Sequence, residues 1–236
     1  MINYDLLKSE LDKIGVTLDE YGLDRFDQYA DRLISWNKHI NLTAITDPDE
    51  IVIKHFVDCL HILRYVNFSA GQQLVDVGCG AGFPGLPLLI ANPQLEVTFV
   101  DSVRKKLGFI KEALNNAGII GRVRHARAEE LGKDNEFRES FDYATARAVA
   151  PLNVLCEYCL PLVKVGGLFI SMKGSNAKQE LDDAENAISK LGGELVKFDE
   201  FELSNGDKRS IIIIRKISQT PTKYPRKPKK IDSRPL

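Results

Sequence analysis

The sequence has no apolar run that approaches the roughly 18 residues of a transmembrane helix. Residues 1–13 alternate charged with apolar side chains, so they lack the core of a secretory signal peptide. Hydrophobic residues fill 44% of the 236 positions and charged residues 28%, which is ordinary for a water-soluble globular chain. We therefore expect a cytoplasmic protein that does not contact a membrane, with a monomer as the default oligomeric state.

Cysteine is scarce, which excludes a disulfide-stabilised scaffold: four thiols do not form such a framework in a chain of this length. Cys156 and Cys159 have the C-x-x-C spacing, but no second pair completes a zinc site. Their apolar neighbours indicate the buried face of a helix. No other group of metal ligands stands out, so we expect no metal.

The net charge is small, −1, but it is unevenly distributed. Residues 218–236 carry six lysines and arginines against one aspartate. A basic tail on a mildly acidic body favours contact with a polyanion, and the alternative is a solvated, disordered terminus. Four prolines from Gln219 onward predict that the tail is not helical and lies extended on a partner.

The order of the predicted elements indicates an α/β fold with extra helices at its N-terminal end. Apolar residues at helical spacing fill residues 1–66, Asp47-Pro48 marks a helix start, and no strand is predicted before residue 73. Beyond that point strands and helices alternate, and a hairpin turn at residues 204–207 joins the last two strands. The predicted strands are 73–77, 95–100, 121–126, 141–146, 167–172, 194–200 and 209–216, and the predicted helices are 84–91, 103–117, 151–162 and 176–191.

A glycine-rich turn between two apolar runs is the most informative motif. Residues 76–85 read Asp-Val-Gly-Cys-Gly-Ala-Gly-Phe-Pro-Gly, after a predicted strand and before a predicted helix. A dinucleotide-binding fingerprint has its third glycine three positions after the second, where this chain has Phe83. Here the third glycine comes one position earlier, at Gly82. The turn resembles motif I of the class I S-adenosylmethionine (SAM) methyltransferases, which implies a Rossmann-like α/β fold with a seven-stranded, mostly parallel sheet.

An acidic residue at the end of the next predicted strand supports the same cofactor. Asp101 stands 25 residues after Asp76, where a carboxylate can accept hydrogen bonds from a ribose diol. Gly78, Gly80 and Gly82 have no Cβ, so the backbone can approach the adenosine and the amino-acid tail of SAM. The alternatives are a tight turn without a ligand and, for Asp101, capping of the following helix.

Further motifs resemble one methyltransferase family along nearly the whole chain. They are residues 36–43, Asp47-Pro48, Lys54-His55, Asp58, residues 76–87, Asp101-Ser102, residues 128–130, residues 145–148, Lys173-Gly174, Thr220-Pro221, residues 223–226 and Pro235-Leu236. In this order they resemble the bacterial small-subunit rRNA methyltransferase G family, also called the glucose-inhibited division protein B family. The chain departs from it after Lys227, where relatives often have a glycine-containing stretch.

The resemblance implies a SAM-dependent enzyme that methylates N7 of one guanine in 16S rRNA. Its partner is then 16S rRNA or the small ribosomal subunit. The chain divides accordingly into an N-terminal helical cap (1–66), a SAM-binding methyltransferase domain (67–217) and a basic, proline-rich tail (218–236).

The residues after the fourth predicted strand fit this reaction. Guanine N7 carries a lone pair and no proton, so its methylation needs alignment more than a general base. Enzymes that methylate exocyclic amines usually have an Asn/Asp-Pro-Pro-aromatic motif here, but residues 145–149 read Thr-Ala-Arg-Ala-Val. Pyrimidine C5 enzymes need a cysteine nucleophile, and Cys156 and Cys159 lie in the following helix without that setting.

The resemblance also assigns the cofactor site. Its candidate residues are Gly78, Gly80, Gly82, Phe83, Asp101, Ser102, Ala128, Glu129 and Arg147. Arg147 is in addition the candidate catalytic residue, next to SAM and the target base, where it pairs with the SAM carboxylate or an RNA phosphate. The alternatives are a structural ion pair for Arg147, core packing for Phe83 and an ordinary first-turn helix acid for Glu129.

Candidate RNA-binding residues fall into two groups. The N-terminal group is Asn37, His39, Asn41, Lys54 and His55, with a satisfied core histidine as the alternative for His55. The tail group is Lys223, Arg226, Lys227, Lys229 and Lys230, which we expect to contact phosphates without reading sequence. Trp36 is expected to anchor the helical cap.

Three other functions remain open at this point. A SAM methyltransferase of a protein or small molecule leaves the basic tail unexplained. A non-catalytic RNA-binding module predicts a broken glycine turn or a missing Asp101, and neither is seen. A NAD-dependent oxidoreductase is opposed by Phe83 in place of a glycine.

Overall fold

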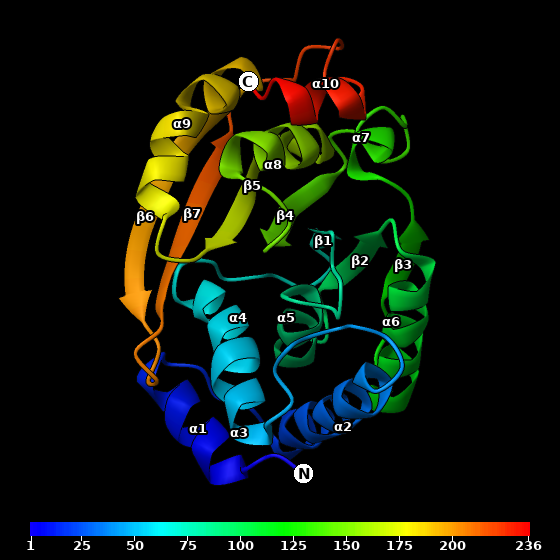
Figure 1. The fold of residues 1–236 in the computed structure, drawn as a ribbon, viewed down its shortest axis with the longest axis vertical. Coiled ribbons are helices and arrows are strands. Elements are labelled where there is room, and N and C mark those ends of the chain that lie inside the picture. The colour runs from blue at the N-terminus through cyan, green and yellow to red at the C-terminus, as the bar shows by residue number, and fades with distance from the viewer.

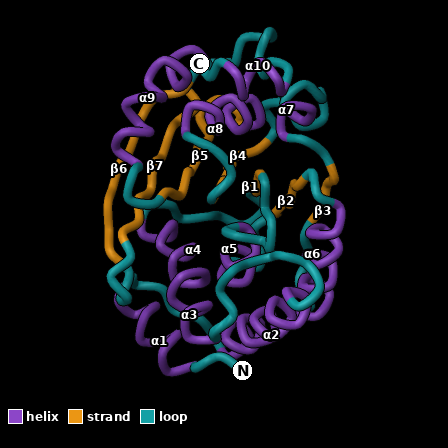
Figure 2. Tube along the Cα trace, in the orientation of Figure 1, coloured by secondary structure: helices purple, strands orange, loops and turns teal.

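A seven-stranded sheet separates two layers of helices. The computed structural model describes residues 1–236, and the strands run in the order β3-β2-β1-β4-β5-β7-β6. They are β1 Gln73–Val77, β2 Glu96–Asp101, β3 Arg122–His125, β4 Phe141–Arg147, β5 Val163–Lys173, β6 Gly193–Glu202 and β7 Lys208–Lys216. Neighbouring strands are parallel, except that β7 is antiparallel to β5 and β6. Figures 1 and 2 show the strands between the two groups of helices, so the predicted α/β fold is confirmed.

The central strands are apolar because helices cover both of their faces. Val75 of β1 and Phe99 of β2 are completely buried, as expected for parallel strands inside an α/β sheet. The four consecutive isoleucines at 211–214 make β7 equally buried. The predicted hairpin between β6 and β7 forms, with Gly206 at a φ of +88° that favours glycine. The largest boundary error is in β5, which begins at Val163 rather than at residue 167.

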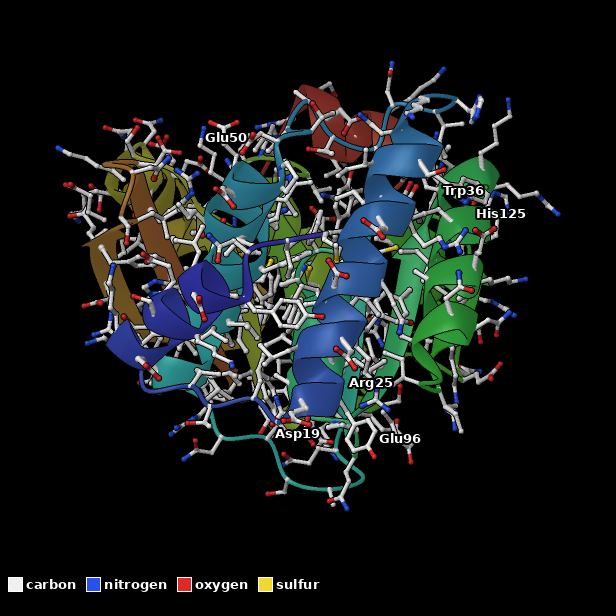
Figure 3. The ribbon with its side chains drawn as sticks, turned by 90° about the horizontal axis from the view of Figure 1, so that it is seen from below. Asp19, Arg25, Trp36, Glu50, Glu96 and His125 are labelled. Carbon is white, nitrogen blue, oxygen red and sulfur yellow. The ribbon has the colours of Figure 1, made fainter.

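The N-terminal helices form one layer with the helices that follow β1 and β2. This layer contains α1 Tyr4–Lys13, α2 Glu20–Asn37, α3 Pro48–Ile51, η1 Val52–Val57, α4 Asp58–Leu60, η2 His61–Arg64, α5 Gly85–Ala91 and α6 Arg104–Ala117. Asp19 and Asp47 cap α2 and α3 by accepting from the backbone N–H three residues later, which confirms the predicted helix start at Asp47-Pro48. Figure 3 shows Asp19 and Trp36 at opposite ends of α2, next to α6.

One hydrophobic cluster of 40 buried residues runs through this layer, so residues 1–66 share their core with the sheet domain. Phe26 and Tyr29 of α2 pack with Phe56, whose ring centroid is 4.7 Å from that of Phe26. None of the helices is both long and apolar enough to cross a membrane. The division of the chain at residue 66 stays a prediction.

The opposite face of the sheet is covered by α7 Ala128–Leu131, α8 Leu152–Cys159, η3 Leu160–Leu162 and α9 Ala177–Lys190 (Figure 1). A second cluster of 24 buried residues lies beneath them. Cys156 and Cys159 are completely buried in α8, which confirms the predicted buried helix face. Burial raises the pKa of the Cys156 thiol.

The prediction of a tail without helix, extended on a partner, is wrong. Residues 228–233 form helix α10, Pro228–Ser233, and Pro228 occupies its first turn, where a missing N–H costs nothing. Tyr224 is buried in the cluster beneath α7 and α8, and Ile231 of α10 is completely buried. The tail therefore folds back on its own chain, and its prolines do not exclude a helix because Pro228 stands in the first helical turn.

Candidate active site

The glycine turn after β1 has the backbone conformation that only glycine adopts easily. Gly78, Gly80 and Gly82 have φ values of +68°, +56° and +97°. A Cβ on Gly78 would come within 2.6 Å of Val149 Cγ2, so the segment after β4 closes directly on this turn. The turn is held to the next strand by a 2.9 Å hydrogen bond from Gly80 N to Asp101 Oδ2.

Both carboxylate oxygens of Asp101 accept hydrogen bonds from backbone N–H groups. Oδ2 accepts from Gly80 N, and Oδ1 accepts from Val103 N at 2.7 Å. Each carboxylate oxygen has a further lone pair, so these bonds fix the group and leave acceptor capacity. The capping alternative for Asp101 is wrong, because the N-cap of α6 is Val103 and no side chain caps this helix; the role as acceptor for a ribose stays a prediction.

A cavity of about 560 Å³ opens at the carboxyl ends of β1 and β2. The predicted cofactor residues on its wall are Gly78, Asp101, Ser102, Ala128 and Glu129. Glu129 is buried, and its Oε1 has no hydrogen-bond partner; the nearest cation, Arg127 Nη1, is 3.8 Å away. A buried acceptor without a donor is costly, so this oxygen is suited to an N–H or O–H of a bound molecule.

Gly80, Gly82 and Phe83 lie outside that wall. Gly80 acts through its bond to Asp101, and Gly82 packs against Ile110 and Tyr29 of the helical layer. Phe83 is buried in the core, where its ring stacks on His55 with centroids 4.4 Å apart. Phe83 thus supports the residues beneath the site, in line with the core-packing alternative.

Asp76 is completely buried under the glycine turn. Its Oδ2 accepts from Gly85 N at 2.9 Å, and its Oδ1 has no partner. Burial raises the pKa of this carboxyl to about 7. Thr145 lies opposite it on β4 and also has an unpartnered hydroxyl, so two polar groups converge at the junction of β1 and β4 without satisfying each other.

A second cavity of about 500 Å³ adjoins the first, and the two share Ala148, Ala150 and Pro151. The segment after β4 therefore forms a common wall. Ala148 has a φ of +56°, which is unfavourable for a residue with a Cβ. Such strain concentrates at functional sites, where the surrounding structure maintains it.

Arg147 is fixed on several sides at the edge of the second cavity. Its Nη1 donates to Asp58 Oδ2 at 3.0 Å and to Lys54 O at 3.2 Å, and its Nη2 bonds His55 Nδ1 at 3.1 Å. The guanidinium carbon lies 4.5 Å from the centroid of the Phe83 ring. The structural ion pair considered for Arg147 is present, and the side chain also lines the cavity.

His55 is a neutral part of this wall. Burial, reinforced by the positive charge of Arg147, lowers its pKa to about 3. His55 Nδ1 lies 3.1 Å from Arg147 Nη2, which can only donate, and 3.1 Å from Lys54 O, which can only accept, while Nε2 lies 2.7 Å from Thr43 Oγ1. His55 belongs to the π-helical segment η1, a local widening often found at functional sites.

Asp58 also links Arg147 to strand β7. Its Oδ2 is 3.5 Å from Nε of Arg209 in β7, and Oδ1 has no partner. Burial raises the pKa of this carboxyl, although both arginines oppose the shift. Arg209 carried no signal in the sequence, because only the antiparallel insertion of β7 brings it to Asp58.

Two further residues, which the sequence analysis did not assign to the site, hold the common wall. Lys173 Nζ bonds Glu180 Oε2 at 2.7 Å and Ala150 O at 2.6 Å. Glu180 Oε2 also accepts from Leu152 N at 2.9 Å. The Lys173-Gly174 motif at the end of β5 was a signal for Lys173, whereas nothing indicated Glu180.

The predicted N-terminal RNA group is divided by the structure. Asn37 Oδ1 accepts from the backbone of Leu42 and Thr43, so it shapes the loop that carries the partner of His55. His39 and Asn41 are exposed in this loop. Lys54 lines the second cavity with its Nζ 2.6 Å from Glu50.

Trp36 anchors the helical layer as predicted. Its Nε1 donates to Glu112 Oε1 at 3.0 Å, and its ring meets Phe109 edge-on. Both partners belong to α6, so the indole joins the end of α2 to the sheet domain.

Four of the predicted tail cations, Lys223, Lys227, Lys229 and Lys230, are exposed. Arg226 is not: its side chain is 12% exposed and binds the fully buried Glu157, with Nη2 and Oε2 2.6 Å apart. We therefore remove Arg226 from the predicted phosphate contacts.

Comparison with known sequences places the chain among methyltransferases. The family model described as "rRNA small subunit methyltransferase G" matches residues 23–212. Ribosomal RNA small subunit methyltransferase G of Clostridium perfringens is 43% identical over 235 residues, covering 99% of this chain and 98% of that protein. The protein of the same name from Acetivibrio thermocellus is 48% identical over 225 residues, covering 94% and 92%.

Solved structures share the fold at low identity. TrmN from Thermus thermophilus has a TM-score of 0.55 at 21% identity, covering 69% of this chain and 49% of that chain. The [4+2]-cyclase SpnF has a TM-score of 0.57 at 14% identity, covering 82% and 94%. A cyclase among these structures shows that the fold alone does not identify the reaction.

Proposed function

The chain belongs to the rRNA small subunit methyltransferase G family, and on that premise we propose that it methylates N7 of one guanine in 16S rRNA. The observation that carries the proposal is the pair of adjoining cavities that share the strained segment after β4. One cavity suits the cofactor and the other the acceptor base. Enzymes that modify ribosomal RNA act where ribosomes assemble, so we propose a cytoplasmic location; the monomeric state stays a prediction.

The first cavity fits the adenosine of SAM. When bound, SAM supplies a methyl group activated by a positively charged sulfur. Asp101 offers acceptor capacity for the ribose hydroxyls, and the unpartnered Oε1 of Glu129 is an acceptor for an N–H of the adenine. The glycine turn permits close approach of the amino-acid tail, and the buried acid beneath it, Asp76, favours a positively charged ligand.

The second cavity supplies position rather than proton transfer. His55 is neutral with both ring nitrogens bonded, Lys173 pairs with Glu180, and Asp58 pairs through Oδ2 with Arg147 and Arg209. Methylation at guanine N7 removes no proton in the transfer step, so the reaction needs no general base on this wall. Alignment of the lone pair with the methyl group is the main requirement.

Arg147 is a positioning residue in this proposal. Three of its five N–H donors are used by Asp58, Lys54 and His55, which leaves one on Nε and one on Nη2. These donors suit a carboxylate oxygen or a phosphate oxygen. The arginine would thereby hold an anionic group of the cofactor or the RNA beside the reacting atoms.

The test supplies methyl-labelled SAM with three acceptors: small ribosomal subunits, protein-free 16S rRNA, and a protein extract without RNA. We expect label in the RNA, at one guanine whose N7-methylation makes the chain cleavable at that position. The subunit and the naked RNA compared at equal concentration identify the preferred substrate. Label confined to protein, or no label despite measurable SAM binding, would overturn the RNA assignment.

A further inference from the structure

The C-terminal residues reach the cavity assigned to the cofactor. Asp232 of α10 and Pro235 beyond it line the same cavity as Asp101 and Glu129. The family model ends at residue 212, before this segment begins. The segment therefore contributes a part of the cavity that the glycine turn and the strand ends leave open.

A buried ion pair fixes this segment in place. Glu157 of α8 is completely buried, and its Oε1 accepts from the backbone N and from Nε of Arg226 at 2.7 and 2.9 Å. Its Oε2 accepts from Nη2 at 2.6 Å, and the remaining Nη1 donates to Arg234 O at 2.9 Å. The Arg226 side chain thus connects α8 to the residues on both sides of α10. Such multiply bonded guanidinium–carboxylate pairs are rigid.

The chain leading into α10 is fixed as well. Arg138 donates to Thr220 O at 2.6 Å and to Tyr224 O at 2.9 Å. The side chain of Ile231 on α10 is completely buried. The position of α10 over the cavity is therefore a packed feature of the fold.

The wall has the chemistry that a purine with an amino group requires. Tyr158 of α8 offers an aromatic ring and Pro235 an apolar surface, while Asp232 offers a carboxylate. The Tyr158 hydroxyl lies 3.5 Å from Asp232 Oδ1, so these two groups flank the same opening. Adenine ligands commonly combine apolar contacts with a few polar partners.

We propose that residues 228–236 belong to the cofactor-binding site and close its adenosine end, with the Arg226–Glu157 pair holding them in position. The inference rests on the proposed function, since the ligand is the adenosine of SAM. The tail then has two roles: Asp232 and Pro235 contact the cofactor, while the lysines of α10, which do not line the cavity, stay exposed for RNA.

The test measures binding of S-adenosylhomocysteine, the demethylated cofactor, by titration calorimetry in the absence of RNA. Three variants address the wall: deletion of 228–236, deletion of 235–236, and Asp232→Ala. Ser233→Ala is the matched control, because Ser233 is exposed on the same helix and does not line the cavity. We expect the Kd to rise about tenfold or more in the larger deletion, less in the smaller variants, and not in the control.

Hydrogen exchange provides a second measurement on the full chain. The amides of residues 228–236 should exchange more slowly with the ligand bound, because the ligand would contact this segment. An unchanged Kd in all three variants would overturn the wall and leave the proposed function standing. No binding by the full chain would overturn both, and a loss confined to RNA affinity would restore the tail to a purely RNA-binding role.

Discussion

Arg147 Nη1 and Asp58 Oδ2 are 3.0 Å apart, although 89 residues separate them in the sequence. The arginine ends β4 and the aspartate begins α4, so the bond joins the sheet domain to the N-terminal layer at the acceptor cavity. Asp58 is buried, and the side chain of Arg147 is only 15% exposed. Removing either charge from such a pair leaves the other uncompensated.

Asp58→Asn should therefore both destabilise the protein and misplace Arg147. We expect a loss of about 3 kcal/mol or more in the free energy of unfolding, because the buried guanidinium loses its counter-charge. The methyl-transfer rate constant should fall about a hundredfold, because a displacement of about 1 Å in a group that positions the substrate costs about that much in rate. Urea denaturation and single-turnover methylation measure the two effects.

Glu96→Gln is the control for that experiment. Glu96, the first residue of β2, pairs with Arg122 of the edge strand β3 at 3.4 Å, and neither residue lines either cavity. An exposed pair is worth less than about 1 kcal/mol, so stability and rate should be nearly unchanged. An Asp58→Asn variant that behaves like this control would contradict the positioning role of Arg147.

Asp76 should make the protein less stable as the pH rises. Its pKa is about 7 in the folded protein against an ordinary value of 3.8, so the folded state binds the extra proton between these values. Stability is then lost as the pH rises from about 4 to 7. Asp76→Asn keeps an acceptor for Gly85 N and should be more stable than the wild type at pH 8, but not at pH 4.

At pH 8, where Asp76 is mostly ionised, the same variant should bind SAM more weakly, because it lacks the buried negative charge under a positively charged ligand. Thermal unfolding at the two pH values and calorimetric titration with SAM test the two statements separately. Equal stability of both proteins at pH 8 would contradict the raised pKa.

His55 should have the opposite pH dependence. Its pKa falls from 6.5 to about 3 on folding, so the unfolded chain binds the extra proton between these values. The contribution is complete above about pH 6.5 and is lost as the pH falls toward 3, at no more than about 1.4 kcal/mol per pH unit. His55→Gln should show a shallower loss of stability below pH 6, measured by urea unfolding across that range. An identical slope in the variant would show that His55 is not the group responsible.

Local patterns in the sequence were sufficient for most of the fold. The seven strands lie where apolar runs predicted them, and the glycine turn and Asp101 meet as their spacing indicated. These features depend on residues within a few positions or on one βαβ unit. The errors arise where long-range packing decides, as for Arg209 reaching Asp58 from β7 and Arg226 reaching Glu157 from the tail.

The helix α10 shows the physical limit most directly. Its six residues contain a proline and two lysines, and no local signal distinguishes them from a solvated tail. Burial of Ile231 and the bond between Arg226 and Glu157 stabilise it. Both depend on α8, which lies about 70 residues earlier, so local sequence analysis does not reveal them.

Gly78 and Val149 offer a test of the contact between the glycine turn and the segment after β4. Gly78→Ala should cost about 2 to 4 kcal/mol of stability, because it combines a left-handed backbone with a 2.6 Å approach to Val149. Gly80→Ala meets nothing closer than 3.9 Å and should cost only about 1 to 2 kcal/mol. In a double-mutant cycle, Val149→Ala should recover part of the loss at Gly78 and none at Gly80. Additive effects at Gly78 would contradict the contact.

The exposed tail lysines should control the salt dependence of RNA binding. Lys223, Lys227, Lys229 and Lys230 point to solvent, whereas Arg226 is committed to Glu157. Four phosphate contacts on single-stranded RNA correspond to a change of about three units in the slope of log K against log salt. Replacing all four lysines by glutamine should reduce the slope by that amount, with the affinity for S-adenosylhomocysteine unchanged. Filter binding of 16S rRNA between low and moderate salt measures the slope, and an unaltered slope would mean that the phosphates contact another surface.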